Sequence, residues 1–288
     1  MKIIVESGAT KAAWRAVGDD GIVTSVQTEG LSPTCLDSEH ISDIVRKAVP
    51  TLNPDGKTVE EIYFYGAGLV SEESAGSLRA CLEIWCPFAR IDFHSDILAA
   101  ARAVFGDGSG VVAIMGTGSN SCFYENGNIV RNIRPGGYVL GDEGSGVALG
   151  KAFLADFIKG LLPKHIEDDF AAQTGLDYST IVRKVYKEQA ASAFLASLAP
   201  FVISHIGDPY IRTMLRDNLD SFVRRALARY SESADDKYAA RRVGVVGSFG
   251  CACEEILREI GSDYGLEFVS FLKSPIDQLV RYHCSYVI

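Results

Sequence analysis

Two short segments rich in Gly, Ser and Thr contain the residue types that bind phosphate groups. They are Ser7-Gly8-Ala9-Thr10-Lys11 and Gly116-Thr117-Gly118-Ser119-Asn120. Each follows an apolar run typical of a buried strand, which would hold the turn in place. Glycine lets the backbone approach an anion closely, and neighbouring N–H groups and hydroxyls can then donate to phosphate oxygens. Either segment alone is typical of an ordinary β-hairpin, but two of them in a repeated context predict a triphosphate site.

Asp96 is the candidate general base. It lies between a predicted strand at residues 90–94 and a predicted helix at residues 97–104. A helix N-terminus favours the ionised carboxylate, which can accept a proton from a substrate hydroxyl. Aspartate is also a good helix N-cap, so a purely structural role stays open.

Residues 136–146 are the most unusual stretch, with five glycines in eleven residues. Such a density of glycine indicates backbone that packs against a ligand. Asp142 and Glu143 lie in this stretch, where a long helical pattern begins. They are candidates for binding Mg²⁺ through water or for accepting hydrogen bonds from substrate hydroxyls, and helix capping is the alternative.

Several familiar motifs are excluded by a missing residue. Residues 56–58 supply the Gly-Lys-Thr tail of a P-loop without its first glycine. Residues 66–71 approach the dinucleotide fingerprint but end in Ser, and residues 246–250 approach the nucleophile elbow but begin with Val. The five histidines show no zinc-type spacing.

The elements that must position these residues form a repeated pattern. Each half opens with a strand, a Gly/Ser/Thr turn, a strand, a Gly-containing hairpin and a third strand, over residues 2–29 and 111–133. Residues 144–230 are strongly helical, and the alternation of strands and helices predicts the α/β class. The Gly-rich residues 106–110 mark a boundary. We therefore expect domains at 1–108 and 109–288, and the last helix is free to pack back on the first domain.

The composition and charge of the chain limit the classes of partner that it can bind. The chain has 288 residues, 47% hydrophobic, and a formal net charge of -9. A field of this sign repels nucleic acid and anionic membranes, so neither is expected as a partner. No signal peptide or run of about 18 apolar residues is present. Seven cysteines without CxxC pairs argue against a disulfide framework, so we expect a reduced, cytoplasmic protein.

Together these segments resemble the sugar kinase/Hsp70/actin superfamily, and within it the N-acetylglucosamine kinase branch grouped with BadF/BadG/BcrA/BcrD-type ATPases. The resemblance spans nearly the whole chain, and residues 116–120 are its most specific match. Residues 6–11 and 115–120 resemble the two phosphate loops. Residues 136–145 resemble the sugar-side segment, and residues 245–250 the adenosine-side turn.

The resemblance implies an α/β fold of two ribonuclease H-like (actin-like ATPase) domains of duplicated topology, the second with a large helical insertion. It implies ATP and Mg²⁺ as cofactors, and Asp96 as the base that takes the proton from the attacking sugar hydroxyl. The implied ATP-binding residues are Gly8, Ala9, Thr10, Lys11, Gly116, Thr117, Gly118, Ser119, Gly247 and Ser248. The implied substrate-binding residues are Ser32, Thr34, Asp96, Ser119, Gly136, Gly137 and Asp142. The implied metal ligands are Glu6 and Asp142.

Four positions depart from the family pattern. Ala9 and Ala12 stand where the first phosphate loop often has hydroxyl side chains, so side-chain donors are fewer there. Glu6 stands where the first phosphate loop usually begins with Asp, and Ser32 stands where the sugar loop commonly has Asn. We expect an ATP-dependent kinase of an amino sugar, either N-acetylglucosamine or a relative such as N-acetylmuramic acid. A non-catalytic nucleotide or sugar sensor and an activator ATPase of a radical enzyme are the alternatives. Apolar stripes in residues 153–230 can pack internally or build a homodimer.

Overall fold

A computed structural model describes residues 1–8, 10–31, 36–69, 72–232 and 239–284. The chain divides into two compact units. Unit 1 comprises Met1–Gly108 together with the C-terminal segment from Ser274, and unit 2 comprises Ser109–Lys273. Each unit is built on one five-stranded sheet. Among the residues described, no helix combines the length and apolar composition needed to cross a membrane.

The sheet of unit 1 has the order β3-β2-β1-β4-β5. Its strands are β1 (Lys2–Ser7), β2 (Lys11–Val17), β3 (Val23–Glu29), β4 (Glu61–Gly66) and β5 (Arg90–Ser95). The first three strands pair antiparallel, whereas β4 runs parallel to β1 and β5 runs parallel to β4. Ser7 pairs with Gly66, and Gly66 with Ser95, so the carboxyl ends of β1, β4 and β5 lie at one edge.

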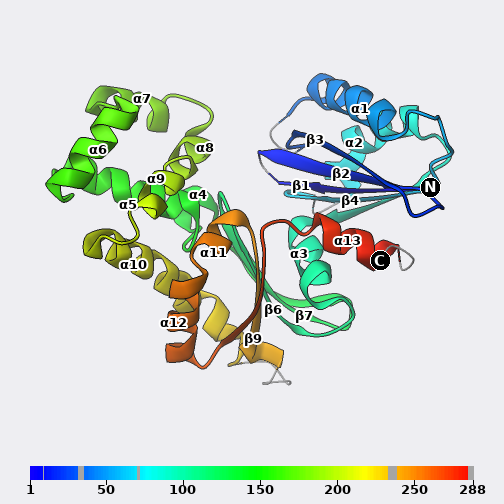
Figure 1. Cartoon of the computed structure of the whole chain (residues 1–288). Coiled ribbons are helices and arrows are strands. Elements are labelled where there is room, and N and C mark those ends of the chain that lie inside the picture. Colours follow the sequence, from blue (N-terminus) through cyan, green and yellow to red (C-terminus); the bar gives the residue numbers. More distant parts are fainter. Residues whose placement is uncertain (9, 32–35, 70–71, 233–238, 285–288) are drawn as a thin grey trace. The chain divides into compact units, whose positions relative to one another are not determined.

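Helices cover both faces of this sheet (Figure 1). The helices are α1 (Ser38–Leu52), α2 (Glu72–Trp85), α3 (Asp96–Phe105) and α13 (Ile276–His283). Ile3 and Val5 of β1 belong to the core beneath α1 and α2, whereas Ile4 belongs to the core beneath α3 and α13. This alternation follows from the two-residue period of a strand that is buried on both faces.

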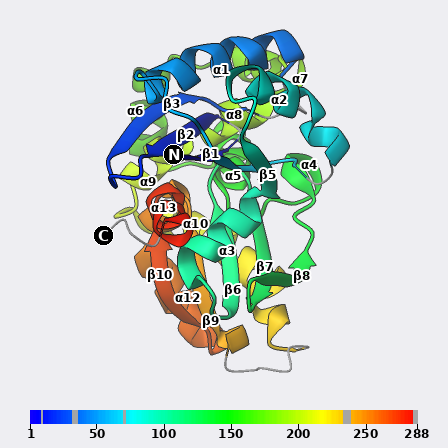
Figure 2. The ribbon, with the colours of Figure 1, turned by 90° about the vertical axis from the view of Figure 1, so that its right-hand side faces the viewer.

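The sheet of unit 2 repeats the same topology, with the order β10-β9-β6-β7-β8 (Figure 2). Its strands are β6 (Gly110–Met115), β7 (Ser119–Glu125), β8 (Asn128–Ile133), β9 (Arg242–Val246) and β10 (Glu267–Leu272). Strands β6, β7 and β8 pair antiparallel, and β9 and β10 are parallel to β6. The expectation of two α/β domains of duplicated topology is confirmed by this match.

A helical insertion separates β8 from β9, as expected from the sequence. Its helices are α4 (Gly137–Leu140), α5 (Gly146–Ile158), α6 (Lys164–Thr174), α7 (Tyr178–Tyr186), α8 (Ala191–Ala196), α9 (Ala199–Ser204), α10 (Pro209–Arg225), and the 3₁₀ turns η1 (Leu227–Tyr230) and η2 (Ala239–Arg241). Helices α11 (Ser248–Ala252) and α12 (Glu254–Tyr264) connect β9 to β10. Edge-to-face contacts among Phe153, Phe170 and Phe201, with ring centroids 4.9–5.6 Å apart, form part of its core.

Candidate active site

The first Gly/Ser/Thr turn joins β1 to β2 in unit 1. The N–H of Gly8 donates to the carbonyl of Lys11 at 3.0 Å, which closes the hairpin. Thr10 and Lys11 are exposed, and Ala9 lies outside the described residues. The side chains of Thr10 and Lys11 can therefore reach a ligand.

Ser7 connects this turn to the predicted sugar loop. Its buried Oγ accepts from the N–H of Leu31 at 2.8 Å and donates to the carbonyl of Gly8 at 3.3 Å. The predicted substrate residues Ser32 and Thr34 follow Leu31 directly, and both lie outside the described residues. Ser7 therefore fixes Leu31, the residue before that loop, to the first turn.

The second Gly/Ser/Thr turn joins β6 to β7 in unit 2. The N–H of Gly116 donates to the carbonyl of Gly118 at 3.0 Å. The carbonyls of Gly116 and Thr117 accept from the first N–H groups of α5, at 2.9 and 3.0 Å. Within the described part of the chain, the N–H groups of Thr117 and Gly118 donate to no other residue. Two neighbouring free donors at a glycine turn are suited to a phosphate oxygen.

Asp142 lies directly against this second turn. A Cβ atom at residue 118 would stand 2.9 Å from its Oδ2. Burial raises the pKa of Asp142, and a hydrogen bond from the N–H of Ser119 opposes that rise. The backbone of Asp142 has φ +60°, a left-handed conformation that non-glycine residues rarely adopt. Such strain is typical of functional sites, where the surrounding contacts hold it in place.

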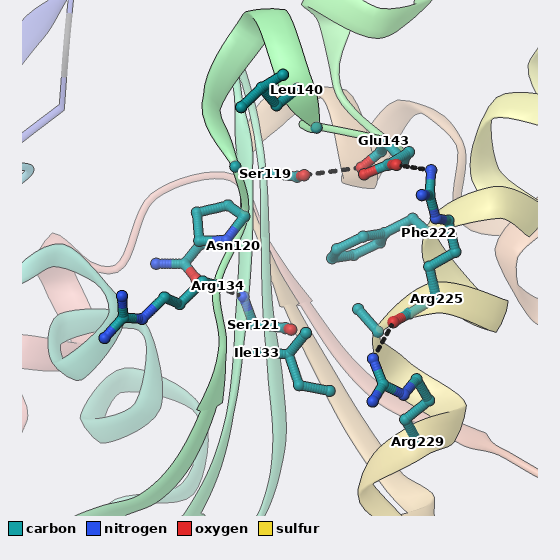
Figure 3. A pocket seen from close by; sticks show the side chains of 14 residues that line it. Ser119, Asn120, Ser121, Ile133, Arg134, Leu140, Glu143, Phe222, Arg225 and Arg229 are labelled. Carbon is teal, nitrogen blue, oxygen red and sulfur yellow. Dashed lines mark hydrogen bonds and ion pairs between the residues drawn. The ribbon is translucent and has the colours of Figure 1, made fainter.

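Helix α10 holds the segment that follows Asp142 (Figure 3). Asn218 accepts from the N–H of Gly144 at 3.0 Å and donates to the carbonyl of Ser145 at 3.2 Å. Arg225 forms an ion pair with Glu143. The hydroxyl of Ser119 donates to the carbonyl of Glu143 at 2.7 Å, so it fixes this segment to the second turn.

The capping role considered for Asp142 and Glu143 is wrong. Helix α5 begins at Gly146, and its N-cap is Ser145, whose side chain accepts from the N–H of Ala148. Because neither acidic side chain caps the helix, the buried carboxylate of Asp142 is left for another role. Glu143 is committed to Arg225.

The predicted adenosine-side turn lies beside the second turn. Strands β6 and β9 are parallel neighbours, and Gly247 follows β9. The φ of Gly247 is +127°, and any Cβ atom there would collide with the carbonyl oxygen of Met115. Ser248 is exposed at the start of α11. The structure thus groups residues 116–119, Asp142 and residues 247–248 within unit 2.

Asp96 and Glu6 lie in unit 1, at the edge where the parallel strands end. The N-cap of α3 is Ser95, so the expectation that Asp96 caps this helix is wrong. Burial raises the pKa of Asp96, although a hydrogen bond from the N–H of Ile97 at 2.8 Å favours the carboxylate. Burial, and then the charge of Asp96, raise the pKa of Glu6 to about 7, while Lys11 opposes the rise. Two neighbouring, half-buried carboxylates favour proton uptake by one of them.

The residues present fit Mg²⁺ only as part of a complex with phosphates. Among the described residues, no three His, Cys, Asp or Glu side chains form a metal-binding group. Mg²⁺ usually binds through one or two carboxylates, several waters and substrate phosphates, which needs no such group. Glu6 and Asp142 each stand beside a phosphate-type turn, so each can supply one oxygen ligand.

Comparisons with known proteins identify the family of the chain. No sequence profile of a known family matches the chain, and no curated protein matches it. The solved structure of a candidate N-acetylglucosamine kinase from Porphyromonas gingivalis is 32% identical, covers 100% of both chains and has a TM-score of 0.90. The chain belongs to the N-acetylglucosamine kinase-like family of sugar kinases.

More distant structures share the fold of this family. A candidate N-acetylglucosamine kinase from Chromobacterium violaceum is 20% identical, with 98% of both chains covered and a TM-score of 0.73. A ROK family glucokinase from Streptomyces griseus, in complex with glucose and AMPPNP, is 16% identical over 98% of this chain and 97% of its own, with a TM-score of 0.57. Both share the two-domain α/β fold of this chain.

The Gly-rich segment of this family member is held in a special backbone conformation. Gly136 and Gly137 both have positive φ, +80° and +72°, and both are exposed. The N–H of Asp142 donates to the carbonyl of Pro135 at 3.2 Å, which closes the loop around the short helix α4. The backbone of Gly136 and Gly137 is therefore accessible to a ligand in unit 2.

Three residues that hold the site were missed from the sequence. They are Asn218, Phe222 and Arg225 on α10, more than 70 residues from the segment that they contact. The helical period placed Phe222 on an apolar face. Its contact with Gly144, and the contacts of Asn218 and Arg225, join residues far apart in the sequence and cannot be predicted from local pattern. The short helix α4 was also missed, because four residues between glycines show no helical period.

Proposed function

We propose that this family member is an ATP-dependent kinase of an amino sugar, N-acetylglucosamine or a relative such as N-acetylmuramic acid. The observation that carries the proposal is the second turn, where two free backbone N–H groups lie beside the buried, left-handed Asp142. A hairpin with a purely structural role has no need of a strained aspartate packed against its glycine. Membership of a sugar kinase family supports the same reading.

ATP is assigned to the two turns and to residues 247–248. In unit 2 the phosphates are assigned to Gly116, Thr117 and Gly118, and the adenosine side to Gly247 and the exposed Ser248. In unit 1 the exposed Thr10 and Lys11 follow Gly8 and add a hydroxyl and a positive charge. Charge-assisted hydrogen bonds to phosphate are roughly twice as strong as neutral ones, so a loop of this kind contributes both position and affinity.

Asp96 is assigned the role of general base. Its half-buried carboxylate has a raised pKa, which brings its proton affinity nearer to the working pH. It would take the proton from the sugar hydroxyl as that oxygen attacks the γ-phosphate. Glu6 and Asp142 would hold Mg²⁺, which when bound neutralises phosphate charge. Asp142 and the backbone of Gly136 and Gly137, with Ser32 and Thr34, are assigned to the sugar.

A substrate panel tests the proposal. Purified protein with Mg-ATP is offered neutral and acidic amino sugars, and phosphorylated products are detected by mass. The Asp96→Asn variant should form product far more slowly while still binding ATP. If the wild-type protein binds ATP but phosphorylates no sugar in the panel, it is a sensor and the kinase proposal is wrong.

A further inference from the structure

A small cavity in unit 2 lies beside the residues assigned to the sugar (Figure 3). Its volume is about 220 Å³. Residues 119–121 of β7, the segment from Ile133 to Glu143, and residues of α10 and η1 line it. Ser119 and Gly136, both assigned to the substrate, are among the lining residues. The cavity is therefore a direct neighbour of the proposed sugar site.

The lining of this cavity is strongly positive. It contains three arginines, Arg134, Arg225 and Arg229, and a single carboxylate, that of Glu143. This concentration is unusual in a chain whose formal net charge is -9. Glu143 is already paired with Arg225, so two positive charges remain. A positive concave site in an acidic protein attracts anions.

Arg229 is the cation best placed to meet an anion. Its guanidinium makes one long hydrogen bond, 3.4 Å to the carbonyl of Arg225, and no ion pair within the described part of the chain. Arg225 and Arg229 project from the same side, opposite Ser121 and Ile133 (Figure 3). Arg134 extends away from them. Arg229 therefore has several donors left for a ligand in the cavity, and a guanidinium matches an oxyanion with two parallel hydrogen bonds.

The size of the cavity limits the ligand. Pockets that enclose a drug-sized molecule have volumes of about 300–1,000 Å³, and this one is smaller at about 220 Å³. It suits one charged substituent rather than a whole nucleotide. An oxyanion can arrive there as part of the sugar or as a free ion such as phosphate.

We infer that the cavity binds an oxyanion carried by the sugar, through Arg229, so that the substrate is an acidic amino sugar with a carboxylate substituent. The inference rests on the proposed kinase function, because it identifies the class of sugar. It assigns to Arg229 a role in specificity that neither the motifs nor the family membership supplies.

The test compares two sugars that differ in one group. N-acetylglucosamine is neutral, and N-acetylmuramic acid carries a lactyl ether with a carboxylate on the same ring. The wild-type ratio of kcat/KM, acidic over neutral, should be well above one, and Arg229→Gln should lower it about tenfold to a hundredfold. Arg229→Lys keeps the charge without the paired donors, so the ratio should fall less.

The matched control is Arg224→Gln. Arg224 lies in the last turn of α10, five residues before Arg229, and is also exposed. Its charge acts on Tyr264, and it does not line the cavity. This variant removes the same charge and should leave the ratio unchanged. An equal fall in both Gln variants would mean that net charge alone sets the preference, and the inference would be wrong.

The remaining outcomes separate the possible sources of the oxyanion. Calorimetry with inorganic phosphate, without sugar, measures binding of a free ion. Phosphate binding that Arg229→Gln abolishes, with an unchanged sugar ratio, would identify a free-ion site and overturn the inference. Phosphorylation of the neutral sugar alone would overturn only the inference, whereas phosphorylation of neither sugar would overturn the kinase proposal itself.

Discussion

The carboxylate of Asp142 packs so closely on Gly118 that a Cβ atom at residue 118 would stand 2.9 Å from Oδ2. This contact joins a phosphate-type turn to the sugar-side segment across 24 residues of sequence. Asp142 cannot retreat easily, because its amide is bound to Pro135 and Ser119 donates to its side chain. Glycine at residue 118 is therefore required by packing.

Gly118→Ala should displace Asp142 and reduce turnover. A shift of about 1 Å at a reacting centre can cost roughly a hundredfold in rate, so we expect a fall in kcat of that order. Steady-state kinetics with the accepted sugar measures it. Gly207→Ala is the matched control, because no atom lies within 4 Å of a Cβ there. Wild-type kcat in Gly118→Ala would show that the position of Asp142 is unimportant.

Asp96→Asn should remove the base but keep the fold. The amide is nearly isosteric and can still accept from the N–H of Ile97. General-base catalysis contributes about 10²- to 10⁴-fold, and we expect a loss in kcat within that range with ATP affinity retained. Asp92→Asn, on the strand that precedes Asp96, removes a half-exposed ion pair with Arg90 at 3.2 Å. It should keep nearly full activity, and equal losses in the two variants would argue against a catalytic role for Asp96.

Glu6 should make the protein less stable as the pH rises toward neutrality. The pKa of Glu6 is about 7 in the folded chain, compared with an ordinary value of 4.5. Between these values the folded state holds a proton that the unfolded chain releases, so the free energy of unfolding falls as pH increases from 4.5 to 7. Glu6→Gln should flatten this part of the profile in urea unfolding at several pH values. An identical profile in the variant would mean that Glu6 ionises normally.

His283 should have the opposite influence on the acid side. Burial, followed by the charge of Arg102, lowers its pKa to about 3, from an ordinary 6.5. Between pH 6.5 and 3 the unfolded chain therefore binds a proton at this residue that the folded chain does not bind. The free energy of unfolding falls as the pH drops from 6.5 toward 3. His283 stacks on Tyr63 with ring centroids 3.7 Å apart and bonds the hydroxyl of Tyr65 at 2.6 Å.

His283→Phe separates titration from packing. The variant keeps a ring on Tyr63 but cannot bind a proton, so its stability should depend less on pH between 6.5 and 4. At neutral pH it should lose about 1 kcal/mol with the hydrogen bond to Tyr65. His40→Gln serves as the control, since His40 is exposed, pairs with Glu29 and has a raised pKa. If His283→Phe stays as acid-sensitive as the wild type, another group is responsible.

The fold could be predicted from the sequence where local pattern and local structure coincide. The apolar run that forms β6 (Gly110–Met115) ends at a glycine turn, and the Asn-Gly at residues 126–127 closes the next hairpin. Such signals fix strands and turns independently of distant contacts. The repeat of the pattern in both halves could be seen in the sequence for the same reason. It corresponds to the two sheets of equivalent strand order in the structure.

The parts that could not be predicted depend on contacts between distant residues or on a choice between equal neighbours. Ser95 and Asp96 are both good N-caps, and the extended backbone of Ser95 decides between them. The role of Asn218 depends on its hydrogen bonds to backbone groups of Gly144 and Ser145. The sequence around residue 218 does not predict these partners. The positive φ of Asp142 could not be read from its residue type.

Helix α13 has a consequence for how the protein is made. It supplies Ile276, Leu279 and Val280 to a core whose other members, apart from Cys284, all come from residues 4–103. During translation these side chains leave the ribosome only after all of unit 2 has been synthesised. Until then, the face of the sheet that contains Ile4 and Tyr65 lacks the helix that covers it. The sheet synthesised first is thus among the last parts to be completed, and a nascent chain stopped before residue 276 would present an unfinished, apolar face to the cell's chaperones.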